Sequence, residues 1–253
     1  MVGPLSALAI AGAGMAAGFI NVVVGSGTLI TFPTLLALGF SPLTANMSNT
    51  IGLVPGSLSG AHAYRKELTG QRRRGVVLGS CSSLGAVIGA FLLLELPGTA
   101  FRQVVPFLIL IACALVAFQP TLSRWLAPSG RQTRRIGHRG QLLYVAVFAT
   151  GIYGGYFGAA QGVILISLLA IFINERLQRL NAMKNVLVML ANLVSGAIFA
   201  LSGHVSWEAV GILAVGSTVG GQFGGRFGRR LPQPALRVAV VVVGTTVAVL
   251  LLV

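Results

Sequence analysis

Apolar residues fall into ten stretches along the chain, five in each half, separated by short polar or glycine-rich segments. Crossing a bilayer core takes about 20 helical residues, and most of the stretches reach or approach that length. The pattern therefore predicts an all-α integral membrane protein. The stretches are roughly 3–24, 28–40, 44–64, 75–95 and 101–120 in the first half, and roughly 141–158, 162–173, 185–203, 208–225 and 238–253 in the second.

Two of these stretches, 28–40 and 162–173, are too short for an ordinary crossing. Each follows a glycine-rich break, Gly25-Ser26-Gly27 in the first half and Gly158-Ala159-Ala160 in the second. The pattern predicts a hairpin in each half whose second arm is a broken or half-length helix, with the two breaks facing each other near the middle of the membrane. Further kinks are expected at Pro33, Pro55 and Pro106.

The two halves also repeat each other. Gly18 and Gly25 are seven residues apart, as are Gly151 and Gly158. Such internal repeats are typical of secondary transporters, which place their binding site where the repeats meet. The sequence predicts a first repeat over 1–120, a basic linker over 121–140 and a second repeat over 141–253, together one transmembrane domain. Further matches join Met47-Ser48-Asn49 to Met183-Lys184-Asn185, and Gly85, Gly89, Pro97 and Arg102 to Gly220, Gly224, Pro232 and Arg237.

The basic residues indicate how the repeats are oriented. An odd number of segments per repeat inverts the second copy relative to the first, which places four loops on one side of the membrane. These loops, 65–74, 121–140, 174–184 and 226–237, hold five, five, three and four of the chain's 18 Lys and Arg residues. Because basic loops stay in the cytoplasm, the pattern predicts a multi-pass protein of the cell membrane with both termini outside the cytoplasm.

A formal net charge of +14 could also indicate a nucleic-acid-binding protein. Such binding needs a basic face on a folded soluble domain, whereas these charges are spread over short loops beside the membrane. We therefore expect contact with anionic lipid headgroups and no nucleic-acid partner.

Little in the sequence favours catalysis. His, Cys, Asp and Glu form no cluster with metal-ligand spacing, and the four acidic residues, all Glu, lie near the ends of segments. We expect no catalytic residue, no metal and no cofactor. An intramembrane enzyme or a membrane assembly subunit remains as an alternative function.

Neutral polar residues within the apolar segments are the candidates for a ligand site. Unpaired amides are costly in hydrocarbon, so they face a wet cavity or, alternatively, hold helices together. A half-helix that begins at Thr28 or Gly162 would point backbone N–H groups and its positive dipole end at a ligand, unless the break is an ordinary surface turn. No acidic residue is nearby in the sequence, and Lys184 lies beside Asn185. Unless the Lys184 side chain reaches the membrane surface instead, these features favour an anion as the ligand. The predicted substrate-binding residues are Gly25, Ser26, Gly27, Thr28, Asn46, Asn49, Gly158, Gln161, Lys184 and Asn185.

Two stretches resemble a known family. Gly25-Ser-Gly-Thr-Leu-Ile-Thr-Phe-Pro33 with Ala45-Asn-Met-Ser-Asn49 is similar to the first repeat of the TauE/SafE family of sulfite-exporter-like transporters, and Gly151 to Gly158 with Asn181-Ala-Met-Lys-Asn185 is similar to the second. The resemblance covers essentially the whole chain, although Ala159-Ala160-Gln161 stands where the family often has further glycines. It implies transport of small sulfur-containing or organic anions across the cell membrane.

We therefore predict a secondary transporter that moves a small anion such as sulfite or a sulfonate. An anion channel is the alternative within transport. A homo-oligomer is compatible with the sequence.

Overall fold

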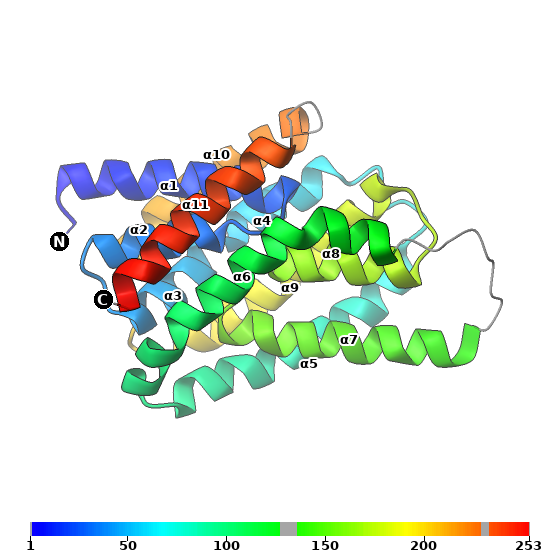
Figure 1. The fold of residues 1–253 in the computed structure, drawn as a ribbon, viewed down its shortest axis with the longest axis horizontal. Helices are drawn as coiled ribbons and strands as arrows, with labels where there is room; N and C mark the ends of the chain where they lie inside the picture. The colour runs from blue at the N-terminus through cyan, green and yellow to red at the C-terminus, as the bar shows by residue number, and fades with distance from the viewer. Residues whose placement is uncertain (1, 127–135, 229–232, 253) are drawn as a thin grey trace.

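The computed structural model describes residues 2–126, 136–228 and 233–252, which form helices joined by turns and short loops (Figure 1). No strand occurs within these ranges, which confirms the predicted all-α class. The helices are α1 (Pro4–Val23), α2 (Thr28–Ala37), α3 (Pro42–Gly52), α4 (Val54–Ala63), α5 (Arg72–Glu95), α6 (Gly98–Leu126), α7 (Ile136–Tyr156), α8 (Gln161–Phe172), α9 (Leu177–Ala200), α10 (Trp207–Phe227) and α11 (Gln233–Leu252).

The short second arms are present at about the predicted length. α2 has 10 residues and α8 has 12, and each follows a break after a long helix. Four described helices are long and apolar enough to cross a membrane by length and composition: Pro4–Val23, Arg72–Glu95, Gly98–Gln119 and Leu177–Ala200.

The third predicted segment, 44–64, is not one helix but two. α3 ends at Gly52 and α4 begins at Val54, with Leu53 between them in a bridge-like conformation (φ −88°, ψ −9°). Pro55 lies in the first turn of α4, where its missing N–H is tolerated, whereas within one continuous helix it would remove a hydrogen bond and clash with the preceding turn. The kink expected at Pro55 is therefore a division of the segment at Leu53, across which the Leu53 N–H still donates to Asn49 and the Ser57 N–H to Leu53.

Helices also extend further than the apolar pattern predicts. α6 runs to Leu126 and α7 begins at Ile136, so both ends of the predicted linker 121–140 are helical, and its central residues 127–135 lie outside the described part. Similarly, α9 begins at Leu177 rather than at residue 185. Backbone hydrogen bonds continue through polar residues, so the end of an apolar stretch does not end a helix.

Glycines allow the helices of the two halves to pack closely. α1 lies against α10, and α7 lies against α5. A Cβ atom on Gly18 of α1 would lie 2.2 Å from the Ser217 carbonyl oxygen, and one on Gly89 of α5 would lie 2.0 Å from that of Ile152. Only glycine lets the helix backbones approach this closely. The first helix of each half thus packs on the helix of the fourth predicted segment of the other half, α10 or α5.

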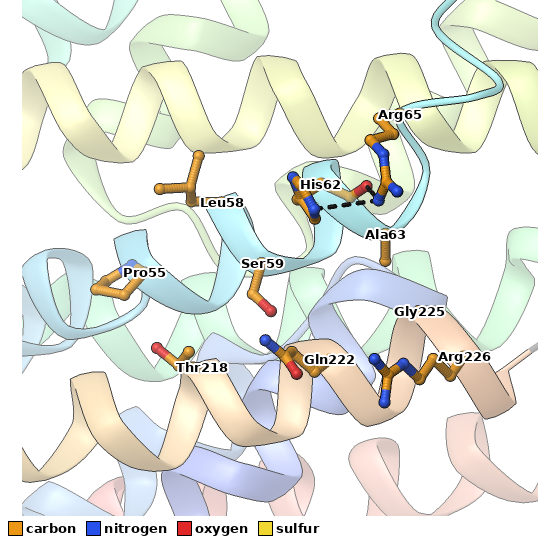
Figure 2. Close-up of a pocket in the computed structure, with 10 residues that line it drawn as sticks. All are labelled: Pro55, Leu58, Ser59, His62, Ala63, Arg65, Thr218, Gln222, Gly225 and Arg226. Carbon is orange, nitrogen blue, oxygen red and sulfur yellow. Dashed lines mark hydrogen bonds between the residues drawn. The ribbon is translucent and has the colours of Figure 1, made fainter.

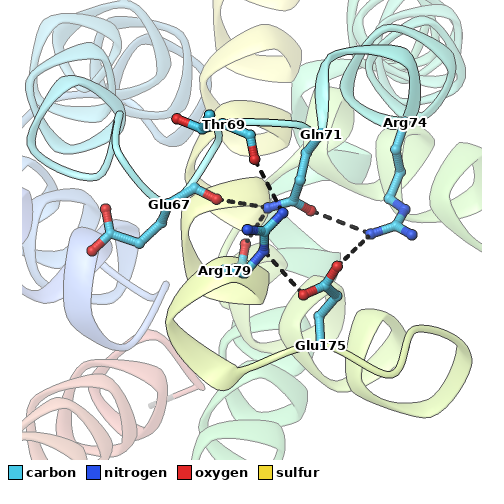
Figure 3. Close-up of polar contacts among 6 residues, drawn as sticks. All are labelled: Glu67, Thr69, Gln71, Arg74, Glu175 and Arg179. Carbon is cyan, nitrogen blue, oxygen red and sulfur yellow. Dashed lines mark hydrogen bonds and ion pairs between the residues drawn. The ribbon is translucent and has the colours of Figure 1, made fainter.

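The loops gather at two ends of the molecule. Both termini lie on the left in Figure 1, where the backbone N–H of Val2 donates to Glu208 at the start of α10. The loops before α5 and α9 lie at the opposite end. There Arg179 donates to the Thr69 carbonyl oxygen (3.1 Å) and pairs with Glu175 (3.0 Å), which also pairs with Arg74 (3.6 Å; Figure 3). Two of the loops that the sequence identifies as basic are therefore joined to each other.

Candidate functional site

The two helix breaks contact each other through their glycines. The N–H of Gly162 donates to the carbonyl oxygen of Gly25 (3.1 Å). A Cβ on Gly25 would lie 2.7 Å from Gly162, and one on Gly162 would lie 2.6 Å from the Cα of Gly25. Gly25 also has a φ of +93°, a conformation that glycine adopts without strain. The breaks thus face each other as the sequence predicts, and they are too close for any side chain to lie between them.

The start of α2 offers a set of free donors. Within the described residues, no carbonyl oxygen accepts from the N–H groups of Ser26, Gly27 or Thr28. The Ser26 side chain is 1% exposed, and its hydroxyl has no hydrogen-bond partner there. Donors at a helix N-terminus, where the dipole end is positive, attract an anion. The predicted roles of these three residues therefore have a structural basis in α2.

The start of α8 is different, which corrects the expectation that it would present free donors from Gly162. The helix begins one residue earlier, at Gln161, and the N–H groups of Gln161, Gly162 and Val163 all donate to carbonyl oxygens. Gly158 and Ala160 both have positive φ values, +73° and +57°. Because of this left-handed turn, the first N–H groups of α8 donate to carbonyl oxygens of the turn itself and of Gly25. The start of α8 therefore joins the two halves and presents no free backbone donors to an anion.

Gln161 contributes through its side chain. It is 1% exposed, and neither its amide oxygen nor its amide nitrogen has a partner among the described residues. Its amide packs directly on Gly154 of α7, where an added Cβ would lie 2.2 Å from Nε2. A buried amide with both groups unpaired is expensive, which marks this position for a ligand or an ordered water.

Asn49 has its partners within its own half. Its Nδ2 donates to the Thr28 hydroxyl (3.3 Å), and its Oδ1 accepts from the hydroxyl of Thr31. These bonds tie α3 to the beginning of α2. Asn49 therefore positions α2 through these bonds, which engage one of the two N–H groups of its amide.

Two other asparagines join the halves. Asn46 of α3 donates to the carbonyl oxygen of Tyr156 at the end of α7 (2.9 Å). Asn181 of α9 donates to that of Val22 near the end of α1 (3.2 Å). The two bonds follow the same pattern. An asparagine of the third segment in one half donates to a carbonyl oxygen at the C-terminal end of the first helix in the other half. A helix leaves its last carbonyl groups without partners of its own, so these bonds satisfy them.

Lys184 is buried and does not reach the surface. Its side chain is 0% exposed, and its Nζ donates to the carbonyl oxygens of Asn21 and Val22, both at 3.1 Å. These carbonyls lie at the negative dipole end of α1, which favours a cation. Among the described residues Lys184 is the one buried Lys or Arg, and none of the four Glu residues is buried. The described interior therefore holds a basic group and no carboxylate.

Asn185 follows Lys184 and is 4% exposed. Its Nδ2 has no hydrogen-bond partner among the described residues, so its donor is available to a ligand. Asn46 and Asn181 each keep an unpartnered Oδ1 as well. The buried polar groups thus include free donors from both halves, Ser26 from the first and Gln161 and Asn185 from the second.

An aromatic cluster joins α2 to α6 and to the end of α7. The ring of Phe32 in α2 meets that of Phe157 in the second break edge to face, with centroids 5.2 Å apart. Phe101 of α6 packs against Phe157 at 6.2 Å and against Tyr156 at 5.7 Å. Such pairs stabilise beyond their buried area, so they help to hold α2 against the chain that leads into the second break.

Two contributors are missing from the predicted site residues. Thr31 bonds both Asn49 and the Gly27 carbonyl oxygen, and it lies one turn after Thr28 on the same face of α2. Asn181 bonds α1, and it lies one turn before Asn185 on the same face of α9. In both cases the residue lies one helical turn from a predicted site residue, and this spacing could have identified it from the sequence.

The model of the family described as "Sulfite exporter TauE/SafE" matches residues 10–251. The chain belongs to the TauE/SafE family. A "Probable membrane transporter protein" of Haemophilus influenzae is 29% identical to this TauE/SafE protein over 208 residues, covering 82% of this chain and 79% of its own. The "Probable membrane transporter protein YfcA" of Escherichia coli K12 is 27% identical, covering 100% and 91%. "YdhB" of Bacillus subtilis, also a "Probable membrane transporter protein", is 25% identical, covering 94% and 96%.

No solved structure gives a significant match to the chain. The family and the apolar helices establish a membrane protein of a transporter family.

Proposed function

We propose that this TauE/SafE protein is a secondary transporter that moves a small anion, such as sulfite, a sulfonate or a related sulfur-containing or organic anion. The observation that carries the proposal is a set of buried, unpartnered donors: the Ser26, Gly27 and Thr28 N–H groups, the Ser26 hydroxyl and the Gln161 amide at the two breaks that meet, and the Asn185 amide on α9. An oxyanion presents only acceptors, so it satisfies these donors together.

The charges support the same choice. Lys184 is buried nearby, against the α1 end that leads into the first break, and all four Glu residues lie outside the buried interior. A cation would find no carboxylate there, whereas an anion gains from the lysine and from the positive end of α2. Among the described residues no base is hydrogen-bonded to the Ser26 hydroxyl, so we infer a transport role rather than an enzymatic one.

We further propose that the halves are inverted repeats and that the site is open alternately to each side. Support comes from the matched packing of α1 on α10 and of α7 on α5. The equivalent hydrogen bonds that Asn46 and Asn181 make from one half to the other support it as well. Transporters built this way place the substrate at the interface between repeats.

A counterflow assay in liposomes tests transport against the channel alternative. Purified protein would be offered sulfite, thiosulfate, sulfoacetate, sulfate and lactate, each with and without the same anion inside. A transporter is expected to take up at least one anion faster when the anion is present inside, because loaded return is faster than empty return. Uptake that is the same with and without internal anion would favour a channel, and no uptake of any of the five would contradict this substrate class.

The second prediction separates a ligand donor from a positioning residue. Asn185→Ala removes a free donor, so the KM for the transported anion is expected to rise about ten- to a hundredfold with little change in melting temperature, since a hydrogen bond to a charged group contributes roughly 1.5–3 kcal/mol. Asn49→Ala removes the bonds to Thr28 and Thr31 and should lower both transport and melting temperature.

Asn174→Ala is the matched control, because Asn174 is exposed in a loop. Normal transport by Asn185→Ala would mean that this amide only packs helices and that the anion binds elsewhere.

The third prediction concerns topology. A reporter at residue 70 is expected in the cytoplasm, and reporters at residue 205 and at the C-terminus are expected outside it. The joined basic loops around Thr69 and Arg179 support this assignment, since basic loops remain cytoplasmic. Accessibility of single cysteines to a membrane-impermeant label would measure it. Labelling of positions 70 and 205 from the same side would exclude the inverted repeat.

A further inference from the structure

A pocket of about 750 Å³ lies between α4 and α10, and the proposed transport site does not use it (Figure 2). On one side the two helices touch through glycines: a Cβ on Gly225 would lie 2.2 Å from the Cβ of Ala63, and one on Gly221 would lie 2.4 Å from the Gly56 carbonyl oxygen. Beside this contact the helices leave a cleft. Its length along α10, from Thr218 to Arg226, is about 12 Å at 1.5 Å per residue.

The two ends of the pocket differ in chemistry. Arg65, His62 and Arg226 line the end next to the basic loops, and Figure 2 shows Arg65, in the turn after α4, and Arg226, on α10, on opposite sides of the pocket. Arg65 is hydrogen-bonded to the ring nitrogen of His62 (3.1 Å). Pro55 and Leu58 line the other end, and Leu58 is 56% exposed. The pocket is therefore cationic at one end and apolar at the other.

Polar groups in the middle of the pocket are available to a ligand. The hydroxyl of Ser59 is buried and has no partner among the described residues. In Figure 2 it points across the pocket toward the amide of Gln222. The ten described lining residues include no carboxylate, so nothing among them neutralises the two arginines.

Apolar side chains also lie on the outer surface of α10, beside the cationic end of the pocket. Phe223 and Phe227 are 52% and 48% exposed and stack on each other with ring centroids 6.0 Å apart. A small free anion would need only the arginines. A ligand that also occupies the apolar length must carry a hydrophobic body and must enter from the lipid side.

We propose that this pocket binds an anionic phospholipid, with the phosphate held by Arg65 and Arg226 and the glycerol backbone and upper acyl chain along Leu58 and Pro55. Basic pockets between membrane helices on the cytoplasmic side recognise lipid headgroups in this way. The inference is independent of the transported substrate, because binding is measured on purified protein without transport.

Native mass spectrometry of the full chain in detergent, with added phosphatidylglycerol or phosphatidylcholine, tests the proposal. Wild-type protein is expected to retain phosphatidylglycerol at least about tenfold more strongly. Each arginine near an anionic headgroup contributes roughly fivefold in affinity, so Arg65→Gln/Arg226→Gln should weaken phosphatidylglycerol binding about twenty- to thirtyfold. Arg72→Gln/Arg73→Gln is the matched control, because these two arginines are exposed near the same end but do not line the pocket.

Three results would overturn the proposal: equal retention of the two lipids, an equal loss in the control pair, or displacement of bound phosphatidylglycerol by glycerol 3-phosphate at similar concentration, which would indicate a site for free anions only. If the double variant does not fold, Arg226→Gln alone and the glycerol 3-phosphate competition on wild-type protein decide the question.

Discussion

Gly220→Ala is expected to destabilise the protein severely. Gly220 lies in the face of α10 that packs on α1, and a Cβ there would lie 1.9 Å from the carbonyl oxygen of Met15 and 2.9 Å from the N atom of Phe19. Adding a methyl group to a well-packed contact typically lowers the free energy of unfolding by about 1–3 kcal/mol. Here the clashing atoms belong to the backbone of α1, so the clash is relieved only if a whole helix shifts. We expect a melting temperature in detergent well below that of wild type and a loss of monodisperse protein.

The same helix provides the control. Gly211 also lies in α10, but an added Cβ would have no heavy atom within 4 Å. Because alanine favours a helix over glycine by about 1 kcal/mol, Gly211→Ala should leave the melting temperature unchanged or slightly raised. Equal melting temperatures for the two variants would show that α1 and α10 do not approach as closely as described.

Lys184→Met is expected to abolish most anion transport. Methionine keeps an apolar stem of similar length but removes the charge and leaves the carbonyl of Asn21 without its donor, whereas that of Val22 still accepts from Asn181. Stranding a buried acceptor costs about 1–3 kcal/mol, so the melting temperature should also fall. Loss of a charged partner for the anion should raise its KM by about ten- to a hundredfold, measured as concentration-dependent uptake into liposomes.

Lys66 is the only other lysine in the chain, and it is exposed. Lys66→Met should therefore leave both transport and melting temperature close to those of wild type. If Lys184→Met lowers the melting temperature but leaves the KM unchanged, the buried lysine serves only to cap α1, and the positive charge has no part in binding.

The apolar pattern predicts much of the fold because a membrane helix needs a long run of apolar residues and few other features. The two short arms follow from the same rule together with the glycine-rich breaks. The pattern fails at helix ends and at Leu53, where a proline in the next helix divides one apolar stretch into two helices. The pattern fails there because hydropathy indicates only whether a segment prefers lipid or water. Where a helix ends depends instead on the backbone geometry.

The sequence by itself determined the class of the protein, its family, the position of the two breaks and the identity of most polar residues near them. Only the tertiary structure decided which of these groups have free atoms. Asn49 and Asn185 occupy equivalent positions in the repeats, yet the first is bonded by Thr28 and Thr31 and the second keeps a free donor. Likewise α2 presents free N–H groups, whereas α8 donates its own to Gly25 and to its own turn. The reason is that hydrogen-bond saturation depends on neighbours brought together from distant parts of the chain, and no local pattern records them.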